Sequence, residues 1–184
     1  MKPFYRFFAL FCGVLCLASP VLAQNDVVYA QAIAAYEKQD FQAAFALLKP
    51  LAEQGDKVAQ HNLAVLYQEG LGVPADAVKA LYWYEKAAEQ GEAEAQFQAA
   101  LMYSQGEGAV QNYPRAVYWY EKAAAQEHPE AQNNLAARYA TGTGVARDIE
   151  LAQKWYERAA ANGNAAAAYT LQQLKQQFTM PKNP

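Results

Sequence analysis

Few side chains in this sequence could act as a covalent nucleophile. Both cysteines, Cys12 and Cys16, lie near the N-terminus, and Ser104 is the one serine after residue 23. A serine nucleophile needs a positioned general base, and Ser104 is followed by Gln-Gly-Glu instead of the lysine of a Ser-x-x-Lys pattern. We therefore expect no catalytic residues and no enzyme activity.

The sequence also contains no pattern typical of a metal-binding or phosphate-binding site. The two histidines, His61 and His128, are far apart in the sequence, and neither lies in a metal-ligand spacing. The Gly-x-Gly turns at 70–72, 106–108 and 142–144 follow expected helices instead of strands, and no Lys-Ser or Lys-Thr completes a phosphate-binding loop. Three carboxylates are interpreted as solvated helix faces: Glu92, Glu94 and Glu130. We expect no metal and no cofactor.

The first 23 residues have the order of an export signal. Lys2 and Arg6 supply positive charge, residues 7–17 are apolar, and residues 19–23 place a proline before Val-Leu-Ala. The sequence predicts cleavage after Ala23. The apolar run is shorter than the roughly 20 residues of a membrane-spanning helix, and no second such run follows it. We expect a periplasmic or secreted protein without stable membrane insertion.

The charge and cysteine content of the remaining chain restrict its partners and its means of stabilisation. Two of the 15 basic residues lie in the signal, so 13 remain against 18 acidic residues, and the net charge becomes −5. This mild acidity argues against a nucleic acid or an anionic lipid surface as partner. No cysteine remains after residue 16. An exported domain without a disulfide must be held together by packing, as stacked helices are.

Three stretches of the chain match one another at an offset of 36 residues, a spacing that indicates stacked structural repeats. The repeated positions include Tyr67, Tyr103 and Tyr139; Gly70, Gly106 and Gly142; Gly72, Gly108 and Gly144; Ala80, Ala116 and Ala152; Trp83, Trp119 and Trp155; and Tyr84, Tyr120 and Tyr156.

One such unit predicts two helices joined by a turn. Residues 58–68 place apolar side chains at helical spacing and form the expected helix A, and the glycines and proline of 69–74 end it. Asp76 is suited to cap the second helix, helix B. Helix B carries one broad stripe of small and aromatic residues: Ala80, Trp83, Tyr84, Ala87 and Ala88. One hairpin buries too little surface to fold alone, so neighbouring hairpins must stack.

The pattern Ala-x3-Leu-Ala-x2-Tyr-x2-Gly-x-Gly-Val-x2-Asp-x3-Ala-x2-Trp-Tyr-x2-Ala-Ala-x2-Gly closely resembles the Sel-one-like repeat family, a relative of the tetratricopeptide repeats. Its departures are Ala99 for leucine, Asn112 for aspartate and Glu127 for the terminal glycine. We divide the chain into a signal peptide (1–23), a tetratricopeptide-like first hairpin (24–57), three repeats within 58–163 (58–93, 94–129 and 130–163), a capping helix (164–178) and a disordered tail (179–184).

The resemblance implies an all-α protein, a right-handed α-solenoid of four antiparallel helix hairpins plus the C-terminal capping helix. By analogy with tetratricopeptide repeats, positions on each helix A line a concave groove that binds a partner protein or peptide. The predicted groove residues are His61, Val65, Gln68, Phe97, Leu101, Ser104, Asn133 and Ala137. Phe97 and Leu101 are large and apolar, and they either anchor a partner or fill space against a neighbouring helix.

Two functions remain open at this point. The first is a non-catalytic adaptor or scaffold of the bacterial cell envelope that docks another protein or a peptide. The alternative is a periplasmic immunity or inhibitor protein that neutralises a secreted toxin or effector. Both need only a rigid curved surface, and for both we expect a monomer.

Overall fold

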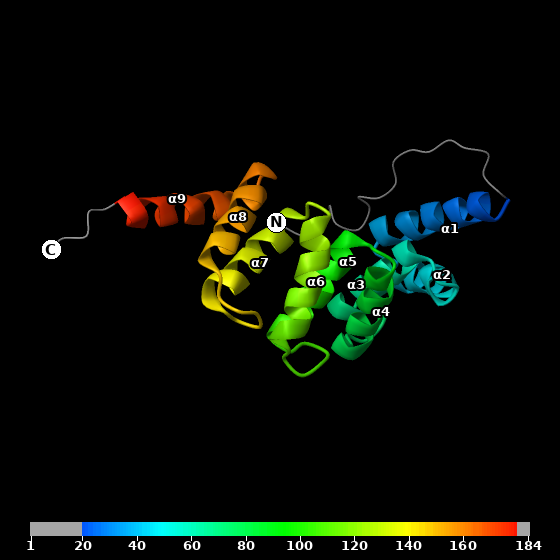
Figure 1. The fold of residues 1–184 in the computed structure, drawn as a ribbon. Helices are drawn as coiled ribbons and strands as arrows, with labels where there is room; N and C mark the ends of the chain where they lie inside the picture. Colours follow the sequence, from blue (N-terminus) through cyan, green and yellow to red (C-terminus); the bar gives the residue numbers. More distant parts are fainter. Residues whose placement is uncertain (1–19, 180–184) are drawn as a thin grey trace. The chain divides into compact units, whose positions relative to one another are not determined.

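The computed structural model describes residues 20–179, and within them every regular element is an α-helix (Figure 1). These helices are α1 (Pro20–Glu37), α2 (Phe41–Glu53), α3 (Lys57–Glu69), α4 (Ala77–Glu89), α5 (Ala93–Gln105), α6 (Tyr113–Ala125), α7 (Pro129–Thr141), α8 (Ile149–Ala161) and α9 (Ala165–Thr179). The prediction of an all-α repeat protein is confirmed.

Parts of two sequence predictions fall outside this range. Residues 1–19 of the expected signal and residues 180–184 of the expected tail lie beyond the described residues. Helix α1 begins at Pro20, so the bond after Ala23 lies near its start. None of the helices in the described part is both long and apolar enough to cross a membrane.

The chain forms two compact units, one ending at Gln90 and the other beginning at Gly91. The first unit contains α1 to α4 and the second contains α5 to α9. Within each unit, every helix packs against the helix that follows it. Both units are therefore stacks of helix hairpins, as the 36-residue offset predicts.

Each helix B begins at a capping residue that recurs at the 36-residue offset. The side chain of Asp76 accepts a hydrogen bond of 3.0 Å from the backbone N–H of Lys79, which confirms the predicted cap of α4. The same bond starts the other three B helices, from Asp40, Asn112 and Asp148. A side-chain acceptor at this position satisfies one backbone donor that the helix itself leaves unpaired.

The two glycines of each Gly-x-Gly turn have different tasks. Gly142 ends α7 in the left-handed conformation, with φ 72°. Gly144 also has positive φ, 80°, and a Cβ there would lie 2.6 Å from the backbone carbon of Tyr113 at the start of α6. In the first unit, a Cβ on Gly72 would lie 2.3 Å from the carbonyl oxygen of Phe41. The second glycine thus lets the turn lie directly on the preceding helix B.

A buried glutamine on helix A links consecutive hairpins. In the first unit, Gln60 Nε2 donates to the carbonyl of Ala52 at 3.1 Å, and Gln60 Oε1 accepts from Gln90 Nε2 at 2.7 Å. The second unit repeats the arrangement with Gln132. Its amide donates to the carbonyl of Ala124 at 3.1 Å and accepts from Asn162 at 2.9 Å. These side chains are 4% and 0% exposed, so each amide satisfies polar groups that the stacking of hairpins removes from water.

The tryptophans of the B helices are buried to different extents. Trp119 is 6% exposed and lies in the core, as its central repeat predicts. Trp83 and Trp155 are half-buried, each packed against a hydrophobic cluster of its own unit. At the C-terminal end, Leu171 and Leu174 of α9 cover the cluster that contains Tyr156. Helix α9 therefore closes the apolar face of the last hairpin.

Candidate partner-binding site

The three predicted groove residues of the first unit lie on α3. All three contact other residues of that unit. His61 is buried, and its ring meets Tyr84 edge to face with centroids 5.6 Å apart. Gln68 Oε1 accepts a hydrogen bond of 2.8 Å from the Tyr84 hydroxyl. Val65 is half-buried and packs against the core cluster that includes Leu63.

Phe97 is packed inside the second unit, so the hypothesis of an exposed anchor at this position is wrong. Its side chain is 6% exposed. The ring stacks on His128, with centroids 4.7 Å apart and planes 22° apart, and it also meets Tyr120 at 6.1 Å. The next hairpin supplies a flat partner for the phenyl ring, and the space-filling alternative holds for this residue.

Leu101, Ser104 and Ala137 do come together, as part of the lining of one open pocket of about 410 Å³ in the second unit. The other lining residues are Gln105, Tyr120, Asn134, Arg138, Thr141 and Thr143. The pocket is thus built from α5, α6, α7 and the turn after α7. Phe97 and Asn133 do not line it, and Asn133 instead donates to its neighbour Asn134 at 3.3 Å.

The one charged residue in this lining is Arg138, which sequence reasoning missed. Its guanidinium donates to Ser104 Oγ and lies over the ring of Tyr113, 4.9 Å from the centroid. Ser104 is only 8% exposed. None of the ion pairs within residues 20–179 gives Arg138 a carboxylate partner. The pocket therefore presents a positive charge held in place by neutral groups.

The tyrosine beside Arg138 stays neutral. Burial raises the pKa of Tyr120 above its ordinary value, although the hydrogen bond from Asn134 and the charge of Arg138 act in the opposite direction. Asn134 Nδ2 donates to the Tyr120 hydroxyl at 3.3 Å. A neutral phenol cannot compensate the guanidinium charge, so the pocket keeps its positive character at physiological pH.

A comparison of the repeats could have revealed Arg138. Two equivalent positions, 36 and 72 residues earlier, hold Met102 and Leu66, which are 1% and 0% exposed. A charged residue at a position that is otherwise apolar and buried departs from the repeat pattern. The predicted groove positions were transferred from tetratricopeptide repeats, and that analogy did not include this position.

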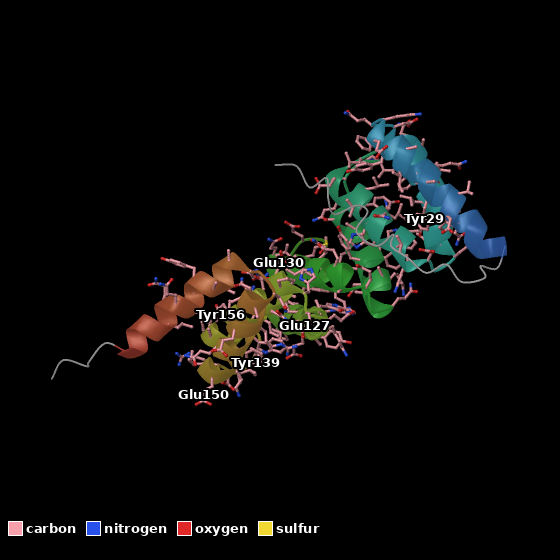
Figure 2. All side chains as sticks on the ribbon, turned by 90° about the horizontal axis from the view of Figure 1, so that it is seen from above. Tyr29, Glu127, Glu130, Tyr139, Glu150 and Tyr156 are labelled. Atoms are coloured by element: carbon pink, nitrogen blue, oxygen red, sulfur yellow. The ribbon has the colours of Figure 1, made fainter. Side chains whose placement is uncertain are left out.

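Another arginine of the second unit, Arg158, differs from Arg138 because a carboxylate neutralises its charge. Its guanidinium pairs with Glu127, at a position where other repeats have glycine. Figure 2 labels Glu127 among the side chains of the second unit. Glu127 has φ 62° and also accepts from Asn162 at 2.7 Å and Gln132 at 2.9 Å. These bonds, with the Arg158 charge, lower the pKa of Glu127 from 4.5 to about 2.

His128 caps a helix. Its Nδ1 accepts from the backbone N–H of Ala131 at 3.2 Å, and its Nε2 lies 3.0 Å from the Glu94 carboxylate. Glu92 caps α5 in the same way and is 6% exposed, so its interpretation as a solvated residue is wrong. Across the described ranges, no group of three histidine, cysteine or acidic side chains is placed to hold a metal.

The family model of the Sel1 repeat matches residues 29–56, 57–92, 93–128 and 129–164. The chain belongs to the Sel1 repeat family. The first matched repeat has 28 residues where the others have 36, and it includes the hairpin that we set apart as tetratricopeptide-like. Its turn between α1 and α2 lacks the Gly-x-Gly insert, and Gln39 there has φ 62°.

Solved structures of other Sel1 repeat proteins are similar to this one. A Sel1 repeat protein from Oxalobacter formigenes is 36% identical, with a TM-score of 0.72 over 78% of this chain and 57% of its own. The protective antigen c5321 of uropathogenic Escherichia coli is 30% identical, with a TM-score of 0.74 over 81% of this chain and 33% of its own. The Helicobacter pylori cysteine rich protein B, 20% identical with a TM-score of 0.57, shares the fold. No curated protein sequence matches the chain significantly.

This Sel1 repeat chain therefore spans 57% and 33% of the first two relatives. Sel1 repeats generally mediate interactions between proteins, and the family is typically a non-catalytic scaffold. A partner-binding role thus agrees with the family, and the open pocket of the second unit is the place where predicted groove residues meet in the structure.

Proposed function

We propose that the chain is a non-catalytic adaptor of the bacterial cell envelope, exported by its first 23 residues, that binds a segment of a partner protein in the pocket between α5, α6 and α7. The observation that carries the proposal is this pocket, where Leu101, Ser104 and Ala137 line one open surface. Leu101 is partly exposed and supplies apolar area. Such a surface can bury one or two side chains of an extended segment.

The physical basis of the proposal is that the pocket is formed by rigid elements. Three of its walls are helices, and the buried Gln132 amide ties α7 both to α6 and to the end of α8. A partner segment that binds there orders itself against a surface that is already ordered, and less conformational entropy is lost on binding.

The test is a pull-down from envelope extract with the purified chain and with two matched variants. Ala137→Gln places a longer side chain in the pocket, while Ala125→Gln makes the same change at an exposed position at the end of α6. We expect one or more proteins to be retained by the wild type and by Ala125→Gln and to be lost from Ala137→Gln. Equal retention by both variants would place the binding surface elsewhere.

The same experiment addresses the alternative role. A secreted toxin among the proteins lost from Ala137→Gln would make the chain an immunity protein instead of an adaptor. A resident envelope protein among the proteins lost from Ala137→Gln would favour the adaptor role.

A further inference from the structure

We propose that the pocket in the second unit selects an acidic residue, and that Arg138 binds the side-chain carboxylate of an aspartate or glutamate within the partner segment. This inference rests on the proposed function and names the chemistry of the partner. Its starting point is charge: nine residues line the pocket, Arg138 is the only charged one, and no carboxylate stands among them.

The partners of Arg138 hold its guanidinium without neutralising it. Ser104 Oγ accepts one of its hydrogen bonds and the Tyr113 ring covers one face. Both groups are uncharged, and Tyr120 beside them is a neutral phenol whose pKa is raised by burial. Arg158 in the same unit differs, because its guanidinium already forms an ion pair with Glu127.

A guanidinium held in this way suits a carboxylate. It has five N–H donors in a planar fork, and a carboxylate can accept two of them in parallel. Ser104, itself 8% exposed, and the ring of Tyr113 fix the orientation of the fork before a ligand arrives. A positioned arginine loses little side-chain entropy when it binds, so its hydrogen bonds contribute more to affinity.

The repeat register supports a role for Arg138 beyond packing. The equivalent position is Leu66 in one repeat and Met102 in another, both buried in the core. An apolar residue at position 138 would therefore satisfy the fold. A cation that lies partly buried beside α5 carries a desolvation cost that an incoming carboxylate offsets.

The other residues that line the pocket indicate which kind of residue lies next to the acidic one in the partner segment. Leu101 and Ala137 provide apolar contact, while Asn134 and Thr141 add polar side chains that are already hydrogen-bonded within the chain. The pocket is open and not enclosed, so its occupant need not be a chain end. We therefore assign an internal acidic side chain, next to an apolar one, as the occupant.

The experiment uses the full chain and a phage-displayed library of random internal heptapeptides. Selected peptides are synthesised with both ends capped, so that no terminal carboxylate is present, and their affinities are measured by calorimetry. We expect the selected peptides to share one aspartate or glutamate. Its replacement by glutamine or asparagine, which removes the charge and keeps the shape, should weaken binding at least tenfold, equivalent to 1.4 kcal/mol.

The protein side of the pair is tested with three variants. Arg138→Met introduces the residue that the preceding repeat carries and should cause the same tenfold loss, with no further loss when the peptide is also changed to glutamine. Arg138→Lys keeps the charge without the fork and should lose less. Lys154→Met removes one positive charge from an exposed position on α8 and should leave affinity unchanged. The affinity of the wild type should also fall with added salt.

Two failures are distinguishable. If peptides bind in a manner blocked by Ala137→Gln, but the glutamine peptides or Arg138→Met bind as well as their parents, the acidic assignment is overturned and the proposed function stands. If no selected peptide is sensitive to Ala137→Gln, the proposed function fails and this inference fails with it. Should Arg138→Met lose its helical spectrum, the glutamine peptides and Arg138→Lys still decide the outcome.

Discussion

Replacing Gly144 by alanine tests the claim that the second glycine of each turn lies directly against the preceding helix. A Cβ at this position would lie 2.6 Å from the backbone carbon and 2.7 Å from the carbonyl oxygen of Tyr113. Neither atom can move without shifting the start of α6. Overpacking of this kind costs about 1–3 kcal/mol, and the left-handed backbone, with φ 80°, adds about 1–2 kcal/mol. The free energy of unfolding should therefore fall by about 2–5 kcal/mol.

Gly163 provides the matched control, because it has φ 91° but no atom within 4 Å of the position that a Cβ would take. Gly163→Ala should lose only the backbone component, about 1–2 kcal/mol. The assay is urea unfolding of both variants and the wild type, followed by the helical signal in circular dichroism. If Gly144→Ala is no less stable than Gly163→Ala, the close approach does not exist and the Gly-x-Gly turn needs another explanation.

Three other experiments test the core, an ion pair and the export signal. Trp119→Ala should reduce the free energy of unfolding by about 3–5 kcal/mol, because it empties a buried aromatic site; a melting temperature within a degree or two of wild type would contradict its place in the core. Glu127 has a pKa of about 2 in the folded chain against an ordinary value of 4.5. Its ionised carboxylate therefore stabilises the folded chain fully above pH 4.5, and this stabilisation is lost as the pH falls toward 2. The free energy of unfolding of Glu127→Gln, measured from pH 5 to pH 2, should fall less than that of the wild type. An equal fall in both proteins would show that the carboxylate does not stabilise the fold. N-terminal sequencing of the protein from the periplasm should begin at Gln24, whereas a cytoplasmic protein with Met1 intact would refute export.

The elements of the fold were predictable because they depend on residues that recur. Asp76 and its equivalents start the B helices, Trp119 is buried in a central repeat, and Gly142 ends a helix. Each of these features is local or repeats at the same offset. A single sequence therefore carries the evidence for them several times.

The details of the site depend on contacts that the repeat pattern does not specify. Phe97 is buried because the following hairpin places His128 flat against it, and no spacing in the sequence indicates that stacking. Arg138 could be found only as an exception to the register that Leu66 and Met102 define. Leu101, for which the sequence left both alternatives open, is half-buried and lines the open pocket together with Ser104 and Ala137.

The buried amides also make the length of this protein adjustable in fixed steps. Gln132 takes one partner from the hairpin before it and one from the end of its own hairpin, and Gln60 does the same in the first unit. A chain that gains or loses 36 residues in register therefore returns every such amide to an equivalent carbonyl and an equivalent cap. An insertion between Ala124 and Gln132 would separate the buried amide from its carbonyl, at a cost of about 1–3 kcal/mol for each polar group left unpaired. The length of the turn inside a hairpin can vary, as the 28-residue first repeat shows, whereas the spacing between each amide and its carbonyl is fixed.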